Sequence, residues 1–394
     1  MEQMRFEQGD LQQDAPKRIK KRQSPRRRLR ALAVVAAAVL AVVAAFVLLD
    51  RTAFDGLRRS IAYMQAEKDE SGCARLFQYS SDGSSRYADL NGSLLVASAN
   101  EITLLDDKGN AAYHTALQFS QVALSAADGQ AAVYEIGGRT LYLLNSRGLV
   151  QQMDLEGDIF AVQMGQGGRF AVTLKKTGYK TTVSVYNGKG EPLYDFNSAQ
   201  SYLLTAAVSE NGKYMAAAAM SQDNGSFVSS LQIYKLTSEA MAAEGTLEGG
   251  VYEMGTVGGR FCAATDKALY FVKTDGTVTS YDFQGASLSR CGLGADKFAA
   301  VLLENYASGG QTHLAIVNAA GEEISSMAVD SEVLDLSAAG RYLAVLYSNK
   351  LVIYDQKLRE CAVLEDVSSA RRVLMRSDGS AVLAGTNAAS LYLP

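Results

Sequence analysis

A two-part phrase recurs along the whole chain and constrains its fold more than any other feature. The first part is a turn residue, usually glycine, followed by a polar or small residue and an apolar run; clear copies span residues 168–172, 212–216, 259–263 and 340–344. The second part is a short apolar strand that ends in a polar residue; copies span residues 141–145, 183–187, 231–235 and 351–355. The chain therefore repeats one unit of short strands.

The length of the repeat predicts a β-propeller. First parts begin at Gly92, Gly129, Gly168, Gly212, Gly259, Asp296, Gly340 and Gly379. Eight repeats over residues 73–394 take about 40 residues each, which is typical of four-stranded propeller blades and not of helical solenoids. We therefore expect an all-β fold, a β-propeller of eight four-stranded blades preceded by one transmembrane helix. Seven blades are the alternative, if one weak repeat is not a blade.

The two ends of the repeat region are expected to meet. The last repeat stops one strand short of a full blade, and residues 75–79 precede the first repeat without a blade of their own. Pairing these two segments would close the ring and cover two sheet edges that would otherwise be free to pair with other chains.

The N-terminal region predicts a membrane anchor. Residues 1–30 contain ten Lys or Arg and four Asp or Glu, a balance of +6, whereas the remainder contains 28 and 38, a balance of −10. Residues 31–49 are uninterruptedly apolar, and as a helix they would span roughly 28 Å, close to the hydrocarbon thickness of a bilayer. The positive-inside rule then places the N-terminus in the cytoplasm. A cleaved signal peptide is the alternative, but no small-residue cleavage site follows the run.

These features divide the chain into four parts. We expect a basic cytoplasmic tail over residues 1–30, a transmembrane helix over 31–50, a juxtamembrane stalk over 51–72 and an extracytoplasmic propeller over 73–394. The spacing of Leu57, Ile61 and Met64 favours a short amphipathic helix in the stalk. No aromatic residue interleaves with the basic run, so we expect the tail to orient the protein at a membrane and not to bind nucleic acid.

The residues of common catalytic and metal sites are sparse. His114 and His313 are about 200 residues apart, and neither has a second ligand at the spacing of a metal site. Among Cys73, Cys262, Cys291 and Cys361 only Cys262 and Cys291 fall in neighbouring blades, so they are the one disulfide pair to consider, although small buried apolar residues are the preferred interpretation. The glycine-rich residues 165–168 lack the spacing of a phosphate loop and are expected to form a blade turn. We predict no catalytic, metal or cofactor-binding residue and no cofactor.

The repeat phrase resembles those of WD40 and quinoprotein-like propellers, in architecture alone. The chain has no tryptophan, so it lacks both the Trp-Asp signature and the tryptophan docking motif, and no cofactor is carried over. As a whole, with its basic tail, apolar segment, residues 57–63 of the stalk and strand repeats, it resembles an uncharacterised family of single-pass membrane propellers of Gram-positive bacteria. That resemblance implies no activity and no site residues.

A binding role is the leading hypothesis. Propellers present broad rigid faces, and function resides in their loops. We expect a non-enzymatic scaffold on the outer face of the cell membrane that binds an unknown protein or envelope polymer; a sensor that signals through a partner at the anchor, or an enzyme acting on an envelope polymer, are the alternatives. Three long loops, residues 175–181, 221–227 and 304–311, carry Tyr179, Phe227 and Tyr306. We predict that these rings form a docking patch on blades three, four and six; the alternative is that they fold back onto blade edges.

Overall fold

The computed structural model describes Gly56, Arg59, Tyr63 and residues 68–70, 72–223, 225–305 and 310–394. The predicted cytoplasmic tail, transmembrane helix and most of the stalk lie outside these residues. In the part of the chain that is described, no helix has the length and apolar character needed to cross a membrane. The unit from Arg58 to Pro394 is described below.

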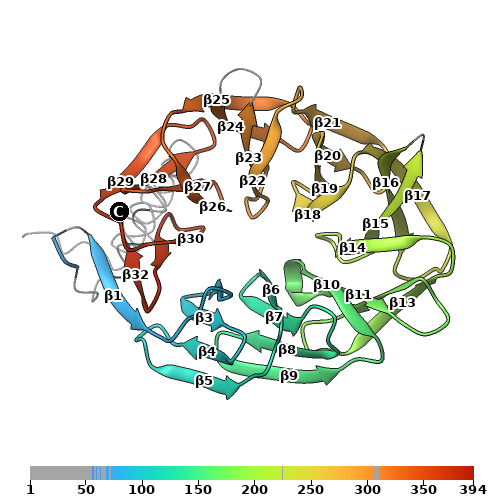
Figure 1. Ribbon diagram of the computed structural model, residues 1–394, viewed down its shortest axis with the longest axis horizontal. Coiled ribbons are helices and arrows are strands. Elements are labelled where there is room, and N and C mark those ends of the chain that lie inside the picture. Colours follow the sequence, from blue (N-terminus) through green and yellow to red (C-terminus); the bar gives the residue numbers. More distant parts are fainter. Residues whose placement is uncertain are drawn as a thin grey trace, which may run out of the picture. The chain divides into compact units, whose positions relative to one another are not determined.

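Eight four-stranded antiparallel sheets stand side by side around a ring, which confirms the eight blades predicted from the repeats (Figure 1). Blades one to four are β2 (Arg86–Leu90), β3 (Ser93–Ala97), β4 (Glu101–Leu105) and β5 (Ala111–Ala116); β6 (Val122–Ala127), β7 (Gln130–Glu135), β8 (Thr140–Asn145) and β9 (Gly148–Asp154); β10 (Asp158–Met164), β11 (Phe170–Lys175), β12 (Thr181–Tyr186) and β13 (Pro192–Ser198); and β14 (Tyr202–Val208), β15 (Tyr214–Asp223), β16 (Ser226–Lys235) and β17 (Met241–Glu248).

Blades five to eight are β18 (Val251–Val257), β19 (Arg260–Thr265), β20 (Ala268–Val272) and β21 (Val278–Asp282); β22 (Ser287–Gly292), β23 (Phe298–Asn305), β24 (Gln311–Asn318) and β25 (Glu323–Val329); β26 (Val333–Ala339), β27 (Tyr342–Tyr347), β28 (Lys350–Asp355) and β29 (Glu360–Glu365); and β30 (Arg372–Met375), β31 (Ala381–Ala384), β32 (Ala388–Tyr392) and β1 (Cys73–Gln78). In each blade the first strand named is the innermost.

Blade eight closes the ring with strands from both ends of the repeat region. Strand β1 pairs antiparallel with β32, so that Cys73 lies opposite Tyr392 and Gln78 lies opposite Ala388. The predicted pairing of residues 75–79 with the last repeat is therefore confirmed. Without β1, the outer edge of β32 would expose unpaired backbone N–H and C=O groups.

The recurring phrase corresponds to the second and third strands of each blade. These strands have neighbours on both sides and are buried on both sheet faces, as in β3 and β27, so their sequences are nearly continuous apolar runs. The outer strands alternate between exposed and half-buried residues, as in β5. Among the described residues the apolar core forms eight clusters, each between two neighbouring blades. The core is thus a ring of interfaces around an open centre.

Tight turns join the first and second strands, as the turn residue at the start of the recurring phrase predicts. At Asn91 and Gly92 both φ angles are positive, 52° and 103°, a conformation that glycine and asparagine adopt most readily. The glycine-rich residues 165–168 also form such a turn, with the 3-10 helix η1 (Gln166–Gly168) between β10 and β11. This confirms that they are a blade turn.

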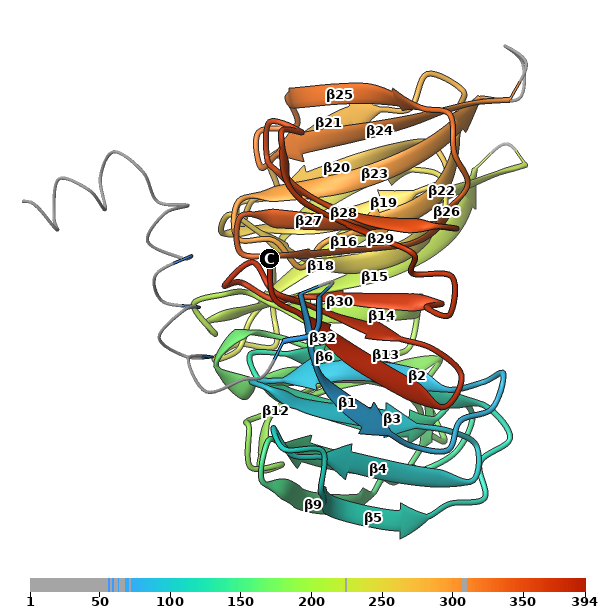
Figure 2. The ribbon, with the colours of Figure 1, turned by 90° about the vertical axis from the view of Figure 1, so that its left-hand side faces the viewer.

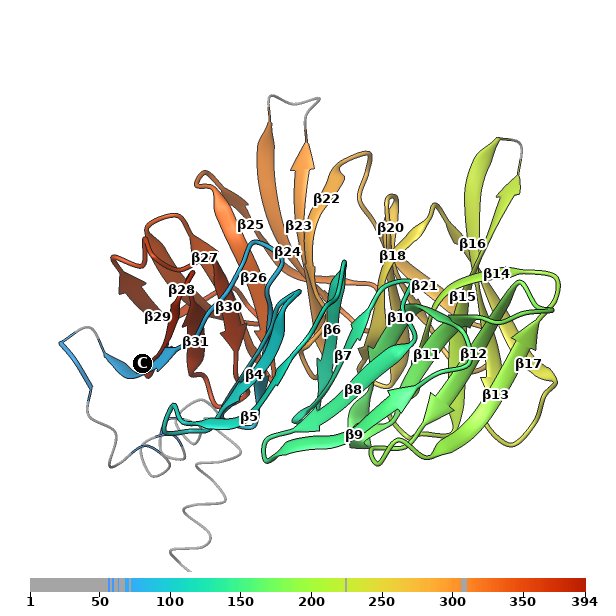
Figure 3. The same ribbon diagram turned by 60° about the horizontal axis from the view of Figure 1, so that its bottom comes forward.

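The ring has two faces with different connections. On one, which we call the turn face, lie the turns between first and second strands and between third and fourth strands, such as residues 91–92 and 108–109. On the other, the loop face, lie the loops between second and third strands, such as residues 176–180, and the links from blade to blade, such as 199–201. The β15–β16 and β23–β24 hairpins project from the loop face (Figure 3). Seen from the side, Pro394 lies on the other side of the ring from these hairpins (Figure 2).

Candidate functional site

The innermost strands of the blades surround a central channel of about 1030 Å³. Much of its lining is small, as in Ala126, Ala207 and Ala338, because the first strands crowd together at the centre of the ring. Among the described residues that line it, the charged ones are acidic with one exception: Asp89, Asp128, Glu253, Asp296, Asp378 and the basic Arg376. The sequence does not indicate this convergence, since these carboxylates stand singly in separate repeats.

Glu253 lies on the inner strand β18 and lines the channel away from the turns. Water reaches its side chain through the channel, but the surrounding blades exclude enough water to raise its pKa from 4.5 to about 7. Burial, and in addition the charge of Glu253, raise the pKa of the Cys262 and Cys291 thiols well above the usual value. These thiols therefore stay protonated and weakly nucleophilic at neutral pH.

The structure places each cysteine and each histidine on a strand. All four cysteines are free, so Cys262 and Cys291 form no disulfide. Cys262 is fully buried and Cys73 and Cys291 are half-buried, but Cys361 is exposed, so the prediction of a buried residue is wrong there. Cys361 lies on the outer strand β29, which faces solvent. His114 and His313 are ordinary strand residues of β5 and β24. Within the described residues, no three His, Cys, Asp or Glu side chains gather as a metal site requires.

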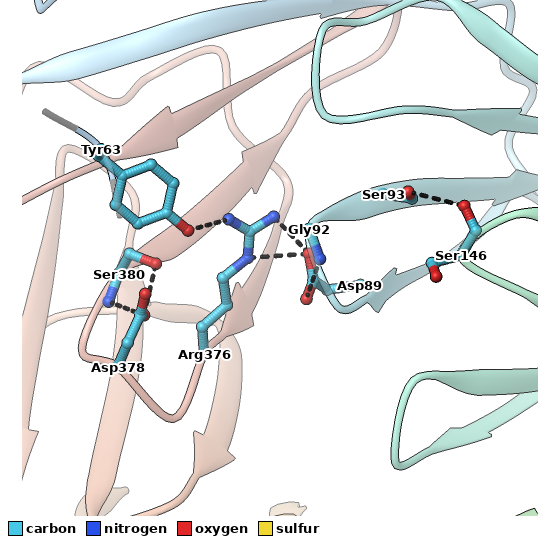
Figure 4. Close-up of polar contacts among 8 residues, drawn as sticks. All are labelled: Tyr63, Asp89, Gly92, Ser93, Ser146, Arg376, Asp378 and Ser380. Atoms are coloured by element: carbon cyan, nitrogen blue, oxygen red, sulfur yellow. Dashed lines mark hydrogen bonds and ion pairs between the residues drawn. The ribbon is translucent and has the colours of Figure 1, made fainter. Parts of the chain in front are cut away.

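At the turn face, a polar cluster joins the last blade to the first beside the channel (Figure 4). Arg376, which follows β30, donates from Nε to Oδ1 of Asp89 on β2 at 2.8 Å, and a second bond runs from Nη2 to the same oxygen. Its Nη1 donates to the hydroxyl of Tyr63 at 3.1 Å. Burial opposes the charge of Arg376, but Asp89 and Tyr63 outweigh it and hold the guanidinium pKa above its usual value.

The segment before β1 is attached to this same face. Arg59 donates to the main-chain oxygens of Asp378 at 3.1 Å and of Pro394 at 2.7 Å. Lys68 donates to the main-chain oxygen of Leu393 at 3.2 Å. The N–H of Tyr63 donates to the carbonyl oxygen of Arg59 at 2.9 Å, a helical hydrogen bond that fits the helix expected in the stalk. The chain therefore enters the propeller on the turn face, against the closing blade.

Two of the three predicted docking residues are described, and both lie on the loop face. Tyr179 is 45% exposed and Phe227 is 60% exposed, so a large part of each ring is in solvent. Tyr306 lies outside the described residues. Tyr179 is in the loop between β11 and β12, where Gly178 has a φ of +92°, and Phe227 is at the start of β16, opposite Gln222 of β15. Their role in docking stays a prediction.

The loop face carries further exposed rings that sequence reasoning missed. Tyr202 at the start of β14 is 58% exposed, and Tyr252 on β18 is 70% exposed. Tyr252 and the exposed Phe160 each occupy the extra position of a β-bulge near the start of an inner strand, and bulges redirect side chains. In the sequence, each of these two rings is an aromatic residue at the second or third position of an inner strand. In a regular strand a side chain at that position would be buried, so the sequence does not indicate its exposure unless the bulge is known.

A closed ring of four-stranded blades around a central channel defines the protein as a β-propeller of eight blades. More specifically, residues 70–361 match the model of a family of unknown function, DUF5711, and the chain belongs to that family. No curated protein matches the sequence.

Solved structures share the architecture at low sequence identity. BamB from Moraxella catarrhalis is 11% identical with a TM-score of 0.50, over 80% of this chain and 98% of that one. The C-terminal WD40 domain of Sif2 is 12% identical with a TM-score of 0.51, over 80% and 95% of the two chains. The dihydro-heme d1 dehydrogenase NirN, solved in complex with DHE, is 15% identical with a TM-score of 0.53, over 77% and 75%. At such identities the likeness shows the fold alone.

Proposed function

We propose that this protein is a non-enzymatic binding or scaffold module, held at the cell membrane by its N-terminal apolar segment and displayed outside the cytoplasm. In this proposal, the loop face of the propeller docks a protein or an envelope polymer. The fold agrees with such a role, because rigid propellers carry variable loops on a fixed frame.

The observation that carries the proposal is the separation of the two faces. Arg59 and Tyr63 contact Asp378 and Arg376 on the turn face, whereas Tyr179 and Phe227 are exposed on the loop face. The described residues before β1 therefore contact the turn face, and the exposed rings on the loop face stay free for a partner. Exposed aromatic rings suit such a surface, since they bury much area at little cost in side-chain entropy.

The proposal is tested by capture of envelope components. The full chain and a Tyr179→Ser, Phe227→Ser, Tyr306→Ser variant are immobilised and exposed to solubilised envelope protein and polymer fractions of the source cells. We expect the variant to lose capture while its melting temperature barely changes, because a large part of each described ring is already in solvent. Undiminished capture, or a large fall in melting temperature, would show that the rings pack and do not dock. Substituting Leu193 and Met241, exposed at the start of outer strands, by Ser is the matched control.

The sensor alternative has one observation in its favour. Tyr63 lines the channel and bonds to Arg376, so a change at the channel mouth would reach the segment that leads toward the anchor. The substitution Tyr63→Phe removes the hydroxyl that accepts from Arg376. If this contact transmits a signal, the variant should lose signalling from the channel to the N-terminal segment and keep capture at the loop face.

A further inference from the structure

The seam between blades three and four carries two lysines and two tyrosines on the loop face. We define this rim patch as Lys175, Tyr179, Lys180 and Tyr202, all exposed. The ammonium group of Lys180 lies 5.1 Å from the centre of the Tyr202 ring and donates to the main-chain oxygen of Gln200 at 2.7 Å. A cation at this distance from a ring face is attracted by its quadrupole. Lys180 and Tyr202 therefore form one surface across the two blades.

Lys175 belongs to the same surface by its position on β11. Ala171, four residues earlier on the strand, packs in the apolar cluster between blades three and four, whereas Leu174 packs in the cluster between blades two and three. Because side chains alternate along a strand, Lys175 is on the side of Ala171 and faces blade four.

The patch is a positive region on an acidic domain. Two nearby carboxylates are each held by another base: Glu156 by Lys176 at 2.9 Å and Asp158 by Arg139 at 2.9 Å. Among the described residues, Lys175 and Lys180 form no ion pair within 4 Å. Residues 31–394 as a whole have a balance of −10 (28 basic against 38 acidic). A negatively charged ligand would thus be repelled from most of the surface and steered to this patch.

The patch is too small for an ordinary protein partner. Fully covered aromatic side chains bury about 150–250 Å² each, so the two half-exposed tyrosines offer on the order of 200 Å². A stable protein interface needs about 800 Å² from each partner. A narrow strand of sugars fits better, because the C–H face of a sugar stacks on an exposed ring while its anionic groups meet the two ammonium groups.

We propose that the rim patch binds one strand of an anionic polysaccharide, with sugar rings on Tyr179 and Tyr202 and acidic groups at Lys175 and Lys180. This inference rests on the proposed function and names the partner class of the loop face.

The absence of tryptophan from the chain allows a local test. Tyr202→Trp places one indole in the patch of the full-length protein, and Tyr252→Trp places one on the same face as a matched control. Each is titrated with an oligogalacturonate, and tryptophan emission is followed. We expect a saturable change for Tyr202→Trp and none for Tyr252→Trp. Binding of the oligosaccharide to the basic tail is the same in both reporters.

Charge variants complete the test. Adding Lys175→Gln and Lys180→Gln to the Tyr202→Trp reporter should weaken binding about ten-fold, whereas Lys189→Gln on the turn face should not. Raising NaCl from about 0.05 to 0.5 M should weaken it further. A silent Tyr202→Trp reporter, equal changes in both reporters, or equally tight binding of poly-glutamate would each overturn the proposal. If one of these three results occurs while the variant with Tyr179, Phe227 and Tyr306 replaced by Ser still loses capture, the polysaccharide assignment is wrong and the proposed function stands. If that variant also keeps its capture, both are wrong.

Discussion

Arg376 and Asp89 join the end of the ring to its beginning across 287 positions of sequence. Arg376 is 8% exposed and Asp89 is 16% exposed at the side chain, so both charges are largely withdrawn from water. Asp89 is on the inner strand β2 of blade one, and Arg376 is in the turn after β30 of blade eight. Among the described strands, no pairing connects these two sheets. The ion pair thus reinforces the seam between these blades beside the apolar cluster that Phe77, Leu94 and Leu391 form there.

Removing one partner of this pair should destabilise the propeller strongly. We expect Asp89→Ala to cost about 3 kcal/mol, because it leaves a buried guanidinium without its counter-charge. The free energy of unfolding in urea measures this. The double variant Asp89→Leu with Arg376→Met should be less destabilised than the sum of its single variants. Arg139→Ala, which breaks a largely exposed pair with Asp158, should cost less than about 1 kcal/mol. Equal effects of Asp89→Ala and Arg139→Ala would contradict the role assigned to the seam.

Deleting residues 73–80 should destabilise the last blade, which is remote in sequence. The deletion removes β1 and the fully buried Phe77, and it exposes the outer edge of β32. Relative to the full chain, we expect a lower melting temperature. We also expect the rate of hydrogen exchange to increase more in β32 than in β16. The substitution Phe77→Ala alone should lower stability by about 3–5 kcal/mol. Unchanged melting of the remaining chain would show that closure by β1 contributes nothing.

Glu253 should make stability depend on pH. Its pKa is about 7 in the folded protein against 4.5 ordinarily, so between these values the folded protein binds more protons than the unfolded chain. Stability from this group is therefore fully present below pH 4.5 and is lost as the pH rises through about 7. Glu253→Gln should match the wild type in acid and become relatively more stable toward pH 8, as measured by the free energy of unfolding across this range. Glu253→Ala should follow the same trend, and parallel curves for wild type and Glu253→Gln would refute the assignment.

The charge bias of the N-terminus predicts the membrane topology. We expect an impermeant protease added to cells without their wall to degrade residues 51–394 and to spare a short N-terminal fragment. A cytoplasmic protein of the same cells, which should stay intact, is the control. Protection of the propeller would reverse the orientation, and a mature chain that begins after residue 49 would indicate a cleaved signal.

The repeats in the sequence predicted eight blades and their order, with seven blades as the alternative. A strand buried on both faces must be apolar throughout, and a tight turn needs residues that tolerate positive φ, so phrases such as residues 212–216 mark each blade without knowledge of its neighbours. The incomplete last repeat and the spare segment 75–79 likewise predicted the closing pair of β1 and β32, because an open edge is unfavourable.

Which side chains meet depends on the tertiary structure. Arg376 lies beside Asp89, and Lys180 over Tyr202, because the ring brings different blades together, and no local pattern encodes distance across a ring. The pKa of Glu253 depends on the surrounding blades, and the exposure of Tyr252 depends on a bulge in β18 that shifts it out of the alternating pattern. The repeated pattern predicts what all blades share, namely buried strands and tight turns. A site forms where individual residues of several strands come together, and the repeat does not specify these residues.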